Sequence, residues 1–385
     1  MEKKLSNKKE RVIVAMSGGV DSSVAALLLK NQGYDVVGMT LRLWTENQGD
    51  SHGGNNRCCS VEDVDDARRI CQKLGVPHYF VNFEKEFQEH VVDYFVSEYD
   101  SGRTPHPCLA CNDKIKFDFL LRRALFLDVD YIATGHYARV SDDGYQFRLL
   151  KGIDESKDQS YVLYTLTQKE LARLKLPVGE YTKDQIRDIA REAELIVADK
   201  PDSQEICFIP SGDYRKFVKE RVEAKPGKFV DIEGNVLGEH PGIQFFTVGQ
   251  RRKLGLNSGD GLPRFVIRID SQNNEVILGR EEELMSQNFS ANKLNFTSTV
   301  APGTEIRVNA RIRYKAKEES ASVYVSDDCA DIRFDQPQRA ITPGQPVVFY
   351  QAEEMIGGGI IEGLKLPSRL NIDEEIVAVS AQDRR

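Results

Sequence analysis

The segment Ser17–Ser23, with sequence SGGVDSS, has the composition of a phosphate-binding loop. It lies between an apolar run and a helical pattern, and at such a turn free backbone N–H groups and the helix dipole both favour an anion. The two glycines let the backbone approach a phosphate closely, and the three serines add hydroxyl donors. No lysine follows at the spacing of the kinase-type loop. We predict a nucleotide-phosphate site of another type; the alternative is a turn in which Asp21 only caps a helix.

Two cysteines, Cys108 and Cys111, form a Cys-x-x-Cys pair directly after Pro105-His106-Pro107. The two prolines predict a rigid loop that presents the thiols, with helix resuming near Lys114. The positive end of a helix favours thiolate, the form of cysteine that attacks electrophiles or binds metal. A redox-active dithiol is the alternative use of this spacing.

A third cysteine, Cys207, lies far along the chain, shortly before Pro210. On its own it would be read as a buried core residue, the commonest fate of a lone cysteine. The other four cysteines have no chemical partner in the sequence and are expected to be bystanders: Cys58, Cys59, Cys71 and Cys329.

The elements that must position these residues follow from the hydrophobic pattern. Short apolar runs alternate with helical stretches in the first third of the chain, which is typical of parallel strands joined by helical crossovers. This predicts a doubly wound α/β unit resembling a Rossmann fold. The strands are expected at 12–16, 36–41, 78–83 and 129–134, with helices around 24–28 and over 61–74.

The rest of the chain shows three successive sequence patterns. A short strand is expected at 145–150 and helices at 168–176 and 183–194; after Pro210 glycine and proline turns separate short strands. From about residue 290 the strands lengthen, which predicts an antiparallel barrel. We therefore expect an α/β catalytic domain over 1–212, a small mostly-β central domain over 213–284 and a C-terminal β-barrel over 285–385.

The bulk composition limits the partners. A chain of 385 residues is longer than one hydrophobic core usually accommodates, which predicts more than one domain. Because the net charge is −8, any RNA site must be a local basic patch. One candidate is the alternating stretch 307–315, in which Arg307, Arg311, Arg313 and Lys315 would share one face of a strand. No apolar run has the length of a membrane span and the first ten residues lack a signal-peptide core, so a cytoplasmic protein without membrane contact is expected.

The loop SGGVDSS resembles the PP-loop family of adenylating enzymes, which hold the pyrophosphate part of ATP. Five motifs in a fixed order make the chain similar to the tRNA-specific 2-thiouridylases: SGGVDSS, GRTPHPCLACN, TGHY, KDQSY and EICFIP. The resemblance implies that ATP and Mg²⁺, with Asp21 working with the metal, adenylate the C2 oxygen of the tRNA wobble uridine. Sulfur from a cysteine desulfurase or sulfur-relay protein then replaces that oxygen, releasing AMP and pyrophosphate.

The resemblance also assigns residues. It places the nucleophile on Cys111, the persulfide on Cys207, and a disulfide between the two in the catalytic cycle. The positions implied for ATP are Ala15, Met16, Ser17, Gly18, Gly19, Val20, Asp21, Ser22, Leu41 and Gly135. Those implied for the target base or tRNA are His106, Pro107, Cys108, His136, Lys157, Asp158, Gln159, Arg313, Tyr314 and Gln345.

Cys108 departs from the better-known members, which have an aspartate there that could act as a general base. Some related enzymes hold a [4Fe-4S] cluster with a Cys-x-x-Cys pair and one distant cysteine, leaving one iron open for sulfide. Cys108, Cys111 and Cys207 supply that ligand count, so we favour an iron–sulfur cluster over a pure persulfide relay. The alternative function is a different PP-loop synthetase acting on a small molecule, which would have no need of the three cysteines.

Overall fold

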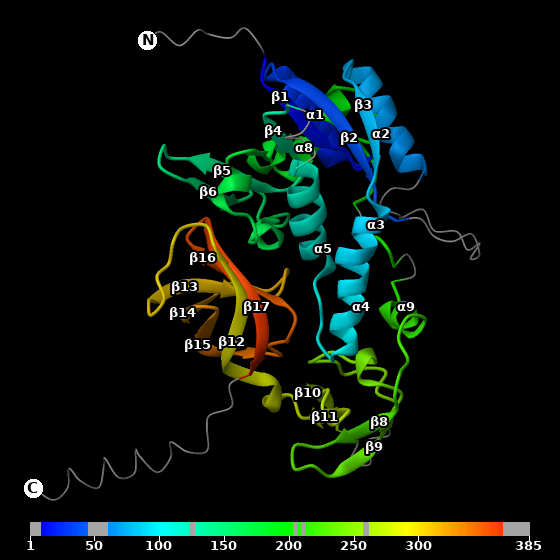
Figure 1. Ribbon diagram of the computed structural model, residues 1–385, viewed down its shortest axis with the longest axis vertical. Coiled ribbons are helices and arrows are strands. Elements are labelled where there is room, and N and C mark those ends of the chain that lie inside the picture. Colours follow the sequence, from blue (N-terminus) through cyan, green and yellow to red (C-terminus); the bar gives the residue numbers. More distant parts are fainter. Residues whose placement is uncertain are drawn as a thin grey trace, which may run out of the picture.

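The computed structural model describes residues 9–44, 61–122, 128–202, 206–209, 212–256 and 262–364. The chain forms an α/β unit, a small central sheet and a β-barrel, with the long helical segment α4 running between the first two (Figure 1). The predicted fold class is confirmed. In the described ranges no helix combines the length and apolar character needed to cross a membrane.

The α/β unit is built on a parallel sheet in the order β3-β2-β1-β4-β7. Its strands are β1 (Arg11–Ala15), β2 (Asp35–Arg42), β3 (His78–Asn82), β4 (Tyr131–Ala133) and β7 (Leu174–Lys175). The helices α1 (Val20–Asn31), α2 (Val61–Leu74) and α8 (Lys183–Glu192) accompany it. The first four strands and α2 lie where the hydrophobic pattern predicts them, because both faces of a parallel sheet are buried and its strands are continuously apolar.

Of two elements predicted after residue 140, the helix is wrong in its extent, whereas the strand is present with a partner that the sequence did not reveal. The helix expected over 168–176 ends early: α7 spans only Gln168–Leu171, and Leu174–Lys175 pairs with β4 as the fifth strand of the sheet. The strand expected at 145–150 is half of a hairpin, β5 (Ala138–Asp142) with β6 (Phe147–Lys151), and β6 pairs with the barrel strand β17. Pairing with a strand 200 residues away leaves no local signal in the sequence.

The region of the cysteine pair is helical. A first stretch comprises α3 (Glu84–Phe87), the π-helical turn η1 (Gln88–Val92) and α4 (Asp93–Asp100). A second stretch, here called the cysteine helix, runs over residues 107–122 as α5 (Pro107–Ala110) and the π-helical η2 (Cys111–Phe119) with its last turn. The predicted rigid loop around Cys108 is therefore wrong, because Pro107 occupies the first helical turn, where proline costs no hydrogen bond.

The other two parts are all-β. The central sheet has the order β10-β11-β8-β9, and six strands close the barrel through the order β12-β15-β14-β13-β16-β17 and the pairing of β12 with β17. The central strands are β8 (Gly227–Val230), β9 (Val236–His240), β10 (Phe265–Asp270) and β11 (Glu275–Gly279). The barrel strands are β12 (Met285–Phe296), β13 (Glu305–Arg311), β14 (Glu319–Val325), β15 (Cys329–Arg339), β16 (Pro346–Gln351) and β17 (Glu354–Leu364).

Short helices complete the connections: η3 (Ser160–Leu163), η4 (Pro177–Glu180), α9 (Tyr214–Lys219), η5 (Ile243–Phe245) and η6 (Glu282–Leu284). The largest core cluster extends from the parallel sheet through the cysteine helix to the barrel residues Val348 and Tyr350. The helices that carry the thiols are therefore packed between the α/β unit and the barrel.

Candidate active site

The phosphate loop follows β1 and leads directly into α1. Gly18 has φ of 74°, and a Cβ atom there would lie 2.2 Å from the carbonyl oxygen of Asp63, so only glycine fits. The hydroxyls of Ser22 and Ser23 donate to the carbonyl of Gly19 and hold the turn. Gly19 caps α1 without any side-chain hydrogen bond, which leaves the first-turn N–H groups to a ligand. This geometry fits the phosphates of a nucleotide.

A lysine that the sequence did not single out reaches this loop from the start of α8. The Lys183 ammonium contacts both oxygens of Asp21 at 2.8 and 2.9 Å and the Asp202 carboxylate at 2.8 Å. The Tyr137 hydroxyl donates to the same Asp21 carboxylate at 2.7 Å. Lys183 is 7% exposed, at the start of α8, where Thr182 and Gln185 form a capping box. The sequence predicts a helix from residue 183, but nothing local predicts where the ammonium reaches.

Asp202 contacts three cationic side chains, one of which is Lys183. Besides Lys183 it accepts from Lys157 at 2.8 Å and from Arg187 at 3.4 Å. Burial by itself would raise the pKa of Asp202, but the hydrogen bonds from Lys157 and Lys183 outweigh burial and lower it. Lys157, expected at the tRNA, is therefore linked through two carboxylates to the phosphate loop.

The segment 134–137 connects the phosphate loop to the cysteine helix. A Cβ atom at Gly135 would lie 2.7 Å from the backbone nitrogen of Ser22, so this glycine allows close packing on the start of α1. The next residue, His136, is buried with its ring 6.2 Å from the Phe117 ring of the cysteine helix. Its pKa is lowered by burial, which favours the neutral ring. ATP held at the loop would therefore face the helix that carries the thiols.

Cys108 is exposed, Cys111 is buried and Cys207 is half-buried. Cys111 begins the π-helical stretch, an irregularity found often at functional sites. Cys207 packs against the same core cluster that contains Cys111, and its neighbour Phe208 stacks edge-on against Phe95 at 5.3 Å. The two thiols predicted to exchange sulfur thus border one hydrophobic cluster.

Aromatic rings lie beside Cys108. The His106 and Tyr161 rings are 6.0 Å apart, and the Tyr161 and Tyr314 rings are again 6.0 Å apart. Burial raises the pKa of Tyr314, with smaller contributions from Asp158 and Cys108, which places the phenol near that thiol. Burial lowers the pKa of His106 to about 4. A flipped base next to Cys108 would meet flat, uncharged surfaces on which it could stack.

The barrel clamps the segment before the cysteine helix. The Thr104 amide donates to the Pro343 carbonyl at 2.9 Å, and the Gln345 side-chain amide donates to the Thr104 and Pro105 carbonyls at 2.9 and 3.2 Å. Gly344 makes this approach possible, since a Cβ atom there would lie 2.9 Å from the Thr104 backbone. Gln345, expected to contact tRNA, is thus used here to position the cysteine helix.

Other residues expected at the ligands are placed as follows. Gln159 accepts from the Tyr137 amide and hydrogen bonds to Tyr314, whereas Asp158 is buried and accepts from Ser160 and Arg311. Arg313 donates to the carbonyls of Arg339 and Ala340. Pro107 is the first residue of α5, Leu41 lies near the carboxyl end of β2, and Ala15 and Met16 lead from β1 into the phosphate loop.

The predicted basic stripe over 307–315 is wrong. The strand β13 ends at Arg311, and Arg313 and Lys315 lie in the following turn. Arg307 forms an ion pair with Asp335 at 2.7 Å, and Arg311 points inward to Asp158 and Glu318. Alternation in the sequence correctly identified a strand, but it gave no information on the carboxylates that neutralise its arginines.

The predicted iron–sulfur ligand set is not assembled in this arrangement. Within the described ranges, which include Cys108, Cys111 and Cys207, no three histidine, cysteine or acidic side chains are grouped so that they could hold a metal ion. One thiol is exposed and another is buried on successive turns of the cysteine helix. The donors therefore do not fit a cluster as they stand. Cys58 and Cys59 lie outside the described residues.

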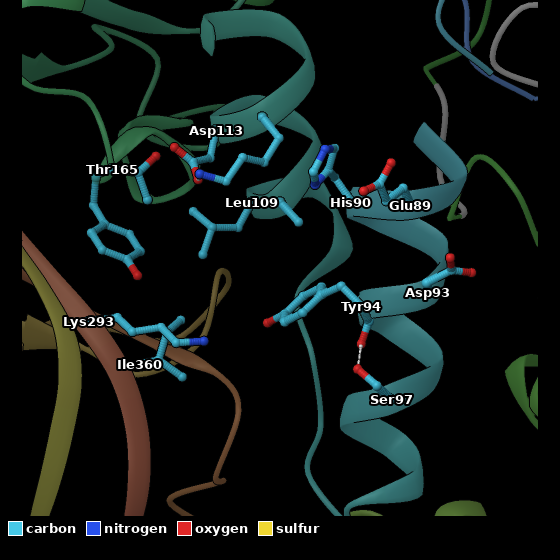
Figure 2. Close-up of a pocket in the computed structure, with 13 residues that line it drawn as sticks. Glu89, His90, Asp93, Tyr94, Ser97, Leu109, Asp113, Thr165, Lys293 and Ile360 are labelled. Atoms are coloured by element: carbon cyan, nitrogen blue, oxygen red, sulfur yellow. Dashed lines mark hydrogen bonds and ion pairs between the residues drawn. The ribbon is translucent and has the colours of Figure 1, made fainter. Parts of the chain in front are cut away.

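A cavity of about 750 Å³ lies behind the cysteine pair. Figure 2 shows Glu89, His90 and Asp93 on the α3–α4 side, Leu109 and Asp113 on the cysteine helix, and Lys293 and Ile360 on the barrel strands. Three carboxylates and the two lysines Lys114 and Lys293 line it, so it lacks the cationic excess that RNA phosphates require, and no residue of the phosphate loop lines it. This cavity is separate from the candidate active site.

Comparison with known proteins decides the family. Three family models match in succession: a tRNA methyl transferase HUP domain over residues 10–211, a tRNA methyl transferase PRC-barrel domain over 215–280 and an aminomethyltransferase β-barrel domain over 286–361. The tRNA-specific 2-thiouridylase of Carboxydothermus hydrogenoformans is 52% identical over 362 residues, covering 92% of this chain and 98% of that protein. The chain belongs to the tRNA-specific 2-thiouridylase family.

A second relative agrees with this assignment. The tRNA-specific 2-thiouridylase of Acetivibrio thermocellus is 48% identical over 359 residues, covering 92% of this chain and 99% of that protein. The matches therefore extend through all three parts of this 2-thiouridylase family member, including the barrel that clamps the cysteine helix.

Proposed function

We propose that this chain catalyses the ATP-dependent 2-thiolation of tRNA uridine, with the wobble uridine as its target. One observation carries the proposal: residues 134–137 contact the phosphate loop on one side, through Gly135 and Tyr137, and the cysteine helix on the other, through His136. Activation by a nucleotide and attack by a thiol would then occur within one crevice. Family membership does not favour the alternative of a small-molecule PP-loop synthetase.

In the first step the uridine O2 attacks the α-phosphorus of ATP held by the Ser17–Ser23 loop, and pyrophosphate leaves. Asp21 is the proposed carboxylate for Mg²⁺, which usually takes one or two carboxylates and completes its shell with water and substrate phosphates. Lys183 would neutralise phosphate charge beside it. Cys108, which is exposed, would hold the flipped base together with His106 and Tyr314 at the start of the cysteine helix.

In the second step the terminal sulfur of a persulfide on Cys207 adds to C2, and AMP leaves with the former O2. The Cys111 thiolate then attacks the Cys207 sulfur and forms a disulfide with it, so the electron pair of the broken S–S bond stays on the new thiocarbonyl sulfur. A sulfur donor protein and a thiol reductant must restore the starting state. No step is routed through an iron–sulfur cluster, because the three thiols are not grouped to hold one.

The test compares Cys111→Ser with Cys329→Ser, an exposed cysteine on the barrel strand β15. The expected result is that Cys111→Ser abolishes thiolation while ATP binding and tRNA binding persist, and that Cys329→Ser retains full activity. Full thiolation by Cys111→Ser would remove this residue from the mechanism. Absence of tRNA-dependent AMP release in the native chain would refute the function itself.

A second comparison separates relay from cluster. Cys108→Asp restores the carboxylate of the better-known members and removes one thiol. If the relay operates, the variant keeps thiolating without iron; loss of both activity and iron–sulfur absorbance after anaerobic purification would contradict the relay. The proposed division at 1–212, 213–284 and 285–385, and the cytoplasmic location, stay predictions.

A further inference from the structure

Three adjacent cations lie on a loop of the central part that no assignment above uses. Arg251, Arg252 and Lys253 are exposed, and within the described part of the chain they form no ion pair. Several arginines elsewhere in this acidic protein are neutralised, as Arg307 is by Asp335 and Arg339 is by Glu281. Three neighbouring cations without carboxylate partners are the arrangement expected where an external polyanion binds.

The backbone of this loop is fixed. The Gly249 amide donates to the Val266 carbonyl at 2.8 Å, the Val266 amide donates to the Gln250 carbonyl at 2.9 Å, and the Gln250 side chain donates to the Arg252 carbonyl at 3.1 Å. Lys253 has φ of 60°, a left-handed conformation uncommon for a side chain other than glycine. The hydrogen bonds therefore fix the positions of the Cα atoms that carry the cations. We call Arg251, Arg252 and Lys253 with the nearby Arg215 the central basic surface.

The central basic surface lines two adjoining hollows. Arg215, Arg252 and Lys253 line one, and Arg251, Lys253 and Arg264 line the other. The only acid lining either hollow in the described ranges is Asp213, whose carboxylate accepts from the Arg215 amide at the start of α9. Lys253 is shared, so the cations form one continuous surface.

Residues next to this surface contact segments that border the candidate active site. The Thr104 and Thr247 hydroxyls are 3.3 Å apart, and Thr104 lies four residues before Cys108, a chain length of at most about 14 Å. On the barrel side, a Cβ atom at Gly249 would touch Ala340, whose carbonyl accepts from Arg313. A nucleic acid with one base at Cys108 would have its backbone leading past these contacts.

We propose that the central basic surface binds the sugar-phosphate backbone of tRNA outside the modified nucleotide. This proposal rests on the proposed function and adds a binding site to it. Arginine and lysine contacts to phosphate carry no sequence information; they set the position and orientation of the RNA. They would allow the enzyme to accept several tRNAs while holding each in one register.

The test is the salt dependence of binding of unmodified tRNA transcript to the native chain and to R251Q/R252Q/K253Q. The matched control is R68Q/R69Q/K73Q, which removes three exposed cations from α2, at the opposite end of the molecule from the central sheet (Figure 1). If three phosphate contacts are lost, raising the salt from roughly 50 to 200 mM weakens the variant about 20- to 40-fold less than the native chain. The control should retain the native salt dependence.

The conservative variant R251K/R252K should bind tRNA with the native salt dependence, because a phosphate contact requires only the positive charge. If the guanidinium groups were needed for the fold instead, lysine would not replace them. An unchanged salt dependence in R251Q/R252Q/K253Q overturns the proposal while leaving the function intact. So does a variant that binds tRNA normally but no longer accepts sulfur from its donor protein, since the surface would then serve a protein. If the native chain itself binds no tRNA, the proposed function fails instead.

Discussion

Replacing Lys183 by methionine tests whether the phosphate loop depends on a charge that lies 162 residues away in the sequence. The change removes an ammonium whose side chain is 9% exposed and which makes three contacts of 2.8 to 2.9 Å with Asp21 and Asp202. Methionine keeps the length and packing of the side chain, so the charge is the main difference. Asp21 and Asp202 then remain close together without the cation between them.

The loss of stability can be bounded. Removing one partner from a fully buried ion pair costs about 3–5 kcal/mol, because the remaining charge has lost its water. Here the side chains of Asp21 and Asp202 stay 31% and 27% exposed, and Asp202 keeps Lys157 and Arg187. Solvent screening and these cations reduce the expected loss to about 2 kcal/mol. The measurement is the free energy of unfolding from urea denaturation, with the exposed Lys219→Met as control.

The pH dependence has a definite sign. The pKa of Asp202 is lowered in the folded chain, so its ionised form stabilises the fold above the unfolded value of about 3.9, and this contribution is lost as the pH falls through the folded value. Lys183→Met removes one of the hydrogen bonds that lower this pKa. The variant should therefore lose less stability than the native chain as the pH falls below the unfolded value, because the folded and unfolded pKa of Asp202 differ less.

The chemical effect should exceed the structural one. A cation beside the phosphates stabilises charge that develops during adenylation, so tRNA-dependent AMP formation should fall about 100-fold or more, with tRNA affinity unchanged. Native AMP formation in a variant destabilised by about 2 kcal/mol would make Lys183 a purely structural residue. An undiminished unfolding free energy would refute the contacts themselves.

Three further outcomes follow from the geometry. Gly18→Ala should abolish ATP binding, since the Cβ atom would lie 2.2 Å from a backbone oxygen, whereas Gly363→Ala on the barrel strand β17, where an added Cβ meets nothing within 4 Å, should retain it; equal binding by both would contradict the loop geometry. Burial lowers the pKa of His106 from 6.5 to about 4, so the folded state resists protonation and should lose up to about 3 kcal/mol between pH 6.5 and 4. His106→Phe should lose less over this range, as measured by urea denaturation at each pH, and an equal loss would exclude His106 as the cause. Gln345→Ala removes two hydrogen bonds to the segment before the cysteine helix, so steady-state kinetics should show a lower kcat for thiolation; a higher KM for tRNA alone would favour direct RNA contact.

Local sequence was sufficient where structure and chemistry are local. The apolar runs around Val12 and Val36 predicted parallel strands, because burial on both faces demands continuous hydrophobicity. The glycines and serines of the Ser17–Ser23 loop predicted its place between β1 and α1, because a close approach of backbone to phosphate restricts residue type. The resemblance of five ordered motifs predicted the family, which the relatives confirm.

The failures concern contacts between distant segments. Leu174–Lys175 becomes a strand because β4 lies beside it, and β6 joins the barrel because β17 is available to pair. The alternation around Arg307 and Arg311 predicts an RNA surface, yet both arginines are neutralised by carboxylates from other segments of the chain.

The sequence alone therefore determined the first four strands of the α/β unit, the phosphate loop, the family and the kinds of reactive residue. Tertiary structure alone decided that Lys183 bridges Asp21 and Asp202, that Gln345 holds the segment before the cysteine helix, and that Arg251 and Arg252 are exposed on the central part. The physical reason is that burial and backbone conformation impose periodic, short-range constraints on residue type, whereas an ion pair requires only that two opposite charges meet in space.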